Sequence, residues 1–214
     1  MGKVPGQALR GGRSGRVVRG RGTSARRGEP GDSMLIEWPD RYAPRRAGVH
    51  VHNELEMPVP PEAVWAWLIR AELWPTWYSN SRKVEVEGGP DLSLGSSFRW
   101  TTFGIRLRSR VKEFVPCGRL AWSADAAGVH AIHVWLIERR PTGCFVVTEE
   151  SQNGGLARLS NLLRPGNISR HHQDWLEGLL RKAKGGPPPA IGDHTPTGRR
   201  AIEPSPQPAR PSRE

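Results

Sequence analysis

His133 and Glu150 are the two residues whose types best suit proton transfer in a buried site. A histidine titrates near neutral pH, and a neighbouring carboxylate can orient its ring. The two residues fall in successive segments, 129–139 and 144–152, that both alternate as strands do. Glu149 is the alternative partner for His133. The sequence therefore predicts a candidate acid–base pair, and the simpler interpretation is a structural sheet histidine beside a solvent-exposed carboxylate.

His50 and His52 are a second pair of histidines with a suggestive spacing. They alternate with apolar residues in segment 49–59, so both lie on one face of a predicted strand. No cysteine or third histidine stands at a spacing typical of a metal site, and we therefore predict no metal and no cofactor. Cys117 and Cys144 are too few for a disulfide framework, so we expect free thiols and a cytoplasmic protein.

The positive charge of the chain is concentrated near its first residue. The net charge is +11, and residues 1–33 carry eight Lys or Arg against two acids. This segment is rich in Arg and Gly and poor in apolar residues, so we expect a disordered arm. The Pro-rich residues 186–214 are expected to be a disordered tail. Residues 34–185 remain as one mildly basic domain.

Three interpretations of the arm stay open. A basic flexible segment can contact nucleic acid, but no aromatic residue stands between these arginines to stack on bases, which disfavours that partner. A transit peptide is a second interpretation, although the glycines oppose the helix it needs. The third is a dispensable segment that precedes a start at Met34.

The domain shows the periodicity of an α+β fold. A strand is predicted over 49–59, and two short helices over 61–70 and 72–78, where four of the nine tryptophans lie. Six further strands follow, each bounded by Gly or Pro: 82–87, 97–103, 105–115, 119–124, 129–139 and 144–152. A long helix or helix pair over 156–184 should break at Pro165-Gly166. No apolar run is long enough to span a membrane.

This order of elements, with its local motifs, resembles the SRPBCC superfamily. The motifs are PPEAVWAWL, WPTWY, LGSSFRW, VKEFVPCGRLAW, HVWLIE, VTEESQNG and WLEGLLRKA, which together cover roughly residues 48–184. They are most similar to the branch of START-like lipid carriers and polyketide cyclases and dehydrases. The resemblance implies a helix-grip fold, in which a curved antiparallel sheet wraps around a long C-terminal helix.

Such a curved sheet leaves a hollow against its helix, and the inward positions here are large and apolar. We expect this hollow to bind a hydrophobic or aromatic small molecule, lipid- or polyketide-like. Its predicted lining is Trp77, Phe98, Trp100, Thr102, Leu107, Ser109, Trp122, Trp135 and Trp175, beside His133. The alternative is that the tryptophan rings fill the hollow as a packed core.

Two further functional interpretations remain. The resemblance to polyketide cyclases and dehydrases makes an enzyme possible, with His133 as base and Glu150 as its orienting carboxylate. Nucleic-acid contact depends only on the arm and on a row of outward basic residues in 105–115, a pattern that more often solubilises a sheet face. We expect a monomer or a weak homodimer.

Overall fold

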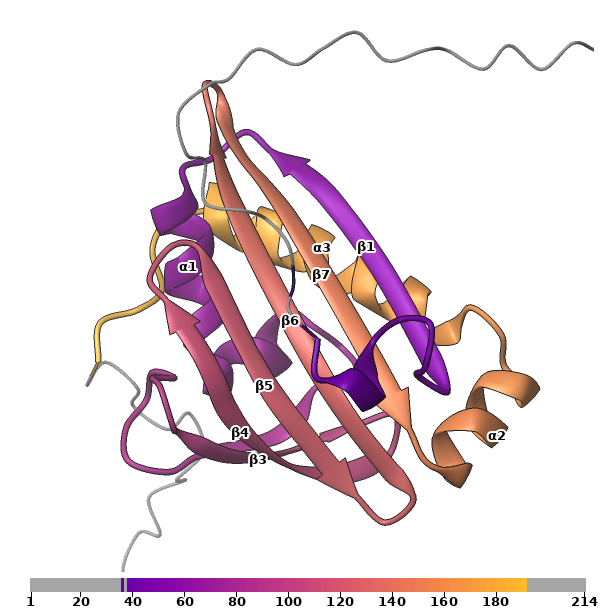
Figure 1. Ribbon diagram of the computed structural model, residues 1–214. Helices are drawn as coiled ribbons and strands as arrows, with labels where there is room; N and C mark the ends of the chain where they lie inside the picture. The colour runs from indigo at the N-terminus through magenta and orange to yellow at the C-terminus, as the bar shows by residue number, and fades with distance from the viewer. Residues whose placement is uncertain (1–35, 37, 192–214) are drawn as a thin grey trace, which may run out of the picture. The chain divides into compact units, whose positions relative to one another are not determined.

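Seven antiparallel strands form one sheet in the part of the chain that the structure describes, residues 36 and 38–191 of a computed structural model (Figure 1). The elements in chain order are η1 (Asp40–Tyr42), β1 (Val49–Met57), α1 (Pro61–Ile69), η2 (Ala71–Thr76), β2 (Arg82–Val86), β3 (Ser97–Thr102), β4 (Ile105–Val115), β5 (Arg119–Ala126), β6 (Val129–Arg140), β7 (Gly143–Asn153), α2 (Gly155–Leu163) and α3 (Asn167–Lys184). The predicted arm, residues 1–33, lies outside the described residues, as do residues 192–214 of the predicted tail.

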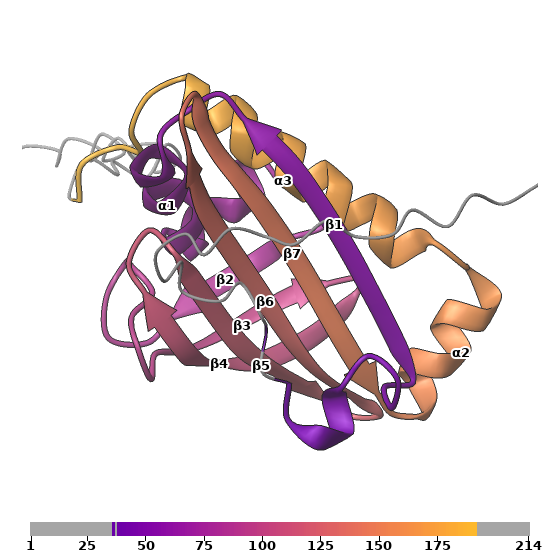
Figure 2. The same ribbon diagram turned by 45° about the horizontal axis from the view of Figure 1, so that its top comes forward.

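The strand order is β1-β7-β6-β5-β4-β3-β2. Strands β2 to β7 form a meander of neighbouring antiparallel pairs, and β1 completes the far edge beside β7, from Val49 opposite Gln152 to Met57 opposite Cys144. The helix α3 packs against β1, β7 and α1, as both views show (Figure 1, Figure 2). This is the predicted α+β helix-grip arrangement.

Local sequence accounts for the helix boundaries. Pro61 occupies the first turn of α1, where a missing N–H donor costs nothing. The second predicted helix is a 3₁₀ helix, η2, which contains Pro75. The predicted C-terminal helix is two helices, because Pro165 ends α2 and Gly166 adopts a left-handed conformation with φ of 72°.

Alternation along β4 divides the two faces of the sheet as predicted. Leu107, Ser109 and Val111 are buried, and the intervening arginines face solvent. The inward side chains meet α3 and η2, where Trp74 and Trp175 are buried with their ring centroids 5.1 Å apart. The core of the domain is therefore an aromatic layer between the sheet and these helices.

The first residues of the predicted tail contact helix α1 and the residue that follows it. The carbonyl oxygen of Gly186 accepts a hydrogen bond of 2.7 Å from the indole N–H of Trp67. The carbonyl oxygen of Pro189 accepts one of 2.9 Å from Arg70. The chain after α3 thus provides a hydrogen-bond acceptor for the indole N–H of Trp67.

Cys117 and Cys144 are free thiols in very different surroundings, which leads to a prediction. Burial raises the pKa of both thiols, that of Cys144 to about 11, but Cys144 is fully buried whereas Cys117 is half-buried in the β4–β5 turn and can be reached by a reagent. Because the thiolate is the reactive form, iodoacetamide at pH near 8 should modify Cys117 and spare Cys144 in the native protein. Peptide mass mapping measures this. In denaturant both should react, and equal native rates for the two thiols would contradict the prediction.

Candidate functional site

An internal cavity lies between the sheet and the two C-terminal helices. Its volume is about 50 Å³. Among the residues predicted to line the hollow or act in it, seven line this cavity: Trp100, Thr102, Leu107, Trp122, His133, Glu150 and Trp175. The α2 residues Leu156, Ala157 and Ser160 border it on another side.

The remaining predicted lining residues lie elsewhere in the structure. Phe98 and Trp135 are fully buried in the aromatic core. Ser109 is also buried, and its hydroxyl accepts a hydrogen bond of 3.1 Å from the indole N–H of Trp100. Trp77 is half-buried and packs against the core from the end of η2. These residues lie behind the side chains that line the cavity. Strand alternation predicts which face of the sheet a side chain is on, but not how deeply it is buried there.

The size of the cavity shows that aromatic rings occupy most of the hollow. Sites for drug-sized ligands typically measure about 300–1,000 Å³, several times the volume found here. Trp122 and Trp175 are buried against each other and against Trp74. The open hollow expected from the sequence is thus largely a packed core with a small cavity at one side.

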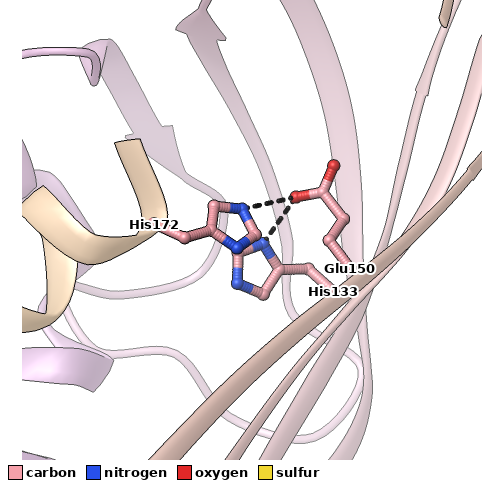
Figure 3. A group of neighbouring side chains, drawn as sticks. All are labelled: His133, Glu150 and His172. Carbon is pink, nitrogen blue, oxygen red and sulfur yellow. Dashed lines mark hydrogen bonds and ion pairs between the residues drawn. The ribbon is translucent and has the colours of Figure 1, made fainter. Parts of the chain in front are cut away.

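His133, Glu150 and His172 line one side of this cavity. Figure 3 shows the two imidazole rings beside the carboxylate of Glu150. His133 on β6 and Glu150 on β7 stand directly opposite each other in the sheet. Nδ1 of His133 is 2.9 Å from Oε2 of Glu150, and Nε2 of His172 on α3 is 3.2 Å from the same oxygen. Both histidines are almost completely buried, and the Glu150 side chain is 13% exposed.

Neighbouring side chains hold this cluster in place. Nε2 of His133 hydrogen bonds to the Thr148 hydroxyl at 2.7 Å. The other carboxylate oxygen of Glu150 accepts a hydrogen bond from the Gln152 amide. The His133 ring also stacks with Trp122, with centroids 4.7 Å apart. The orientations of His133 and Glu150 are therefore set by contacts on both sides of each group.

The surroundings of His133 and Glu150 determine their charge. Burial lowers the pKa of His133 to about 4, although the nearby carboxylate of Glu150 opposes this shift. Burial by itself would raise the pKa of Glu150, but the contacts with His133 and His172 outweigh it and hold that pKa below its usual range. At neutral pH the cavity thus contains a carboxylate beside a neutral imidazole of His133.

The structure distinguishes the two candidate carboxylates. Glu149 points to the opposite face of β7, where its carboxylate is 2.6 Å from Nδ1 of His52. His52 also contacts Glu54 at 2.9 Å. The spaced histidines of β1 therefore belong to a separate group on the outer face of the sheet, and Glu150 is the partner of His133.

Sequence reasoning did not identify His172 as a site residue. The apolar stripe of the C-terminal helix contains it, among Ile168, Trp175, Leu176 and Leu179, all of which are buried. A histidine within such a stripe was the available signal. Its relation to His133 depends on how α3 is rotated against the sheet, and helical periodicity does not specify that rotation.

Comparisons with known proteins agree with the fold and cavity. The family model for polyketide cyclase / dehydrase and lipid transport matches residues 48–184, and the chain belongs to this family. Family membership implies a ligand-binding cavity. No curated protein matches the sequence.

Solved structures resemble the domain along most of their length. A hypothetical protein from Helicobacter pylori is 28% identical, with a TM-score of 0.65, over 71% of this chain and 97% of that one. A Thermus thermophilus protein is 18% identical, with a TM-score of 0.51, and the match covers 64% of this chain and 98% of that protein. The di-domain ARO/CYC StfQ from the steffimycin biosynthetic pathway is 13% identical, with a TM-score of 0.53, and the match covers 64% of this chain and 51% of that protein. At identities this low, the last two show the fold alone.

None of the described helices has the length and apolar character needed to cross a membrane.

The contacts of Glu150 predict a specific loss of stability on substitution. In Glu150→Gln the charge that both imidazoles contact is removed, and the hydrogen bond from His172 to this charged group contributes about 1.5–3 kcal/mol. We expect the free energy of unfolding, measured by urea denaturation at neutral pH, to fall by at least about that amount. Glu54→Gln, which alters a carboxylate that is 55% exposed and lies 2.9 Å from His52, should cost less than about 1 kcal/mol. Equal losses for the two variants would argue against the buried cluster.

Proposed function

We propose that the chain binds a small, mainly apolar molecule carrying one hydrogen-bond donor, with that donor against Glu150 and the rest among the aromatic rings. The observation that carries this proposal is a buried carboxylate, with two histidines, at one side of a cavity whose other lining residues are mainly apolar. Apolar walls supply affinity, and a few polar groups fix orientation. Membership of a family named for polyketide cyclases and lipid transport supports the same class of ligand.

A neighbouring groove supplies room that the cavity lacks. The groove has a volume of about 680 Å³ and shares Phe103, Leu156 and Ser160 with the cavity lining. Leu159 and Leu163 add apolar surface to it. A ligand that enters between these shared residues has its polar end in the cavity and its apolar body in the groove.

Helix α2 is the wall whose movement would join the two spaces. Of its residues Ala157 is the buried one, whereas Leu159, Leu162 and Leu163 are exposed. Displacement of α2 would therefore expose little apolar surface that is now buried, and its free-energy cost would be small. Gly154 precedes the helix with φ of 116°, and Gly166 follows its last turn, so residues with wide conformational freedom flank α2.

Binding of naphthol to the full chain tests this proposal by calorimetry. The hydroxyl of naphthol can donate to Glu150, so naphthol should bind roughly tenfold or more tightly than naphthalene. The anion of naphthoic acid should bind more weakly than naphthol, because its charge meets that of Glu150.

Two variants serve as matched controls for the location of the ligand. Ala157→Trp places a large ring beside the cavity and should abolish naphthol binding, whereas Leu162→Trp, at a position 76% exposed, should not change it. Equal affinities for naphthol and naphthalene, or unchanged binding to a folded Ala157→Trp variant, would contradict the proposed site.

Catalysis of a dehydration is a second candidate, favoured by the 2.9 Å contact between His133 and Glu150 at the cavity surface. His133 would remove the proton next to the carbonyl of a β-hydroxyketone, and the imidazolium so formed would return this proton to the hydroxyl, which leaves as water while the carbon–carbon double bond forms. Diacetone alcohol is a test substrate, since its product is an enone that absorbs in the ultraviolet. His133→Gln should lower an observed rate by about 10²–10⁴-fold. His130→Gln, which alters an exposed histidine paired with Asp125, should leave it unchanged. Equal rates in wild type and His133→Gln would exclude this role.

A further inference from the structure

We propose that His133, Glu150 and His172 bind a divalent transition-metal ion, with further coordination positions open to the cavity. The donor set consists of two imidazole nitrogens and one carboxylate oxygen, whose ligand atoms all lie within 4.8 Å of one another. Two imidazoles and a carboxylate suit zinc and ferrous ions and leave positions for water or an oxygen donor. This inference goes beyond the binding of an organic molecule, and an ion at Oε2 of Glu150 would compete there with the donor group of such a molecule.

The distances within the cluster fit coordination of one ion. Ligands held about 2.1 Å from a metal, at angles between about 90° and 109°, lie roughly 3.0–3.4 Å apart. Oε2 of Glu150 is 3.2 Å from Nε2 of His172 and 2.9 Å from Nδ1 of His133. Two of the three ligand-atom pairs therefore stand close to coordination distance, and the two imidazole nitrogens lie within 4.8 Å of each other.

The direction of the His133 ring supports an ion more than a direct hydrogen bond. Although Nδ1 is 2.9 Å from the carboxylate, among the described residues it has no aligned hydrogen-bond partner. Its in-plane direction thus points away from the line that joins it to Oε2. A metal bonded to both atoms lies off that line, as the misalignment of His133 requires. Nε2 of His172 is instead hydrogen bonded to Oε2 at 3.2 Å, so that ring would turn toward the ion on binding.

Hydrogen bonds from neighbouring residues occupy one atom each of His133 and Glu150 and leave the other atom available to a metal ion. Thr148 hydrogen bonds to Nε2 of His133, and Gln152 donates to Oε1 of Glu150. Nδ1 and Oε2 remain to face His172. Metal-binding histidines and carboxylates are commonly oriented by such second contacts, which fix the ring and its tautomer.

The cavity meets the remaining needs of a metal site. A carboxylate that is 13% exposed among aromatic rings benefits from a positive charge close by. The volume of about 50 Å³ accommodates on the order of three or four water-sized ligands. The ion would therefore be enclosed and still have positions free for exchange.

Cobalt titration of the untagged full chain, first dialysed against a chelator, tests the proposal. We expect one Co²⁺ per chain, with visible absorption bands characteristic of a coordinated ion, and displacement of Co²⁺ by Zn²⁺. His133→Ala, Glu150→Gln and His172→Gln should each weaken Co²⁺ binding by at least about 100-fold. Urea denaturation confirms that each variant is folded.

The outer-face group on β1 and β7 is the matched control. His52→Ala removes a histidine that contacts two carboxylates at 2.6 and 2.9 Å, and it should leave Co²⁺ affinity unchanged. Loss of binding in His52→Ala instead of His172→Gln would overturn the proposal. So would the absence of any Co²⁺, Zn²⁺ or anaerobic Fe²⁺ binding by the wild-type chain. Naphthol calorimetry in the presence of chelator reports separately on the organic ligand.

Discussion

Packing of the Trp175 ring against the inner face of the sheet is the interaction on which the arrangement of the domain depends. Trp175 is 1% exposed and stacks on Tyr78, with centroids 4.4 Å apart and planes 3° from parallel. Its ring also lies 5.1 Å from Trp74 and 5.2 Å from Trp135. Contacts of this kind bury large apolar areas with defined geometry, so they fix both the depth and the rotation of α3.

That rotation in turn positions the polar cluster. His172 precedes Trp175 by three residues, so the two side chains share one face of α3. With Trp175 seated among the rings, His172 meets Glu150 on β7, which the sheet register has already placed opposite His133. The aromatic layer therefore both fills the hollow and holds the cluster at its side. A small cavity follows from the same packing.

Strand periodicity predicted more of this site than helix periodicity did. Alternation along β6 and β7 correctly placed His133 inward, and it left two acidic neighbours whose faces only the register distinguishes. The fold could be predicted because its turns, proline positions and apolar faces all act locally. The depth of each side chain below the cavity surface could not be predicted from the sequence. Phe98 and Trp135, for example, lie on the inward face of the sheet but do not line the cavity. His172 was missed for the same reason, because its role depends on contacts between α3 and two distant strands.

The cost of the cluster is an argument for its function. A buried carboxylate with two imidazoles seldom contributes as much stability as apolar side chains of similar volume. Here it interrupts an aromatic layer that otherwise packs closely, at the one side of the layer where a cavity exists. Folding alone gives no reason for three ionisable groups at that place. Their convergence on one oxygen, Oε2 of Glu150, is explained if a bound ion or a bound ligand offsets their cost.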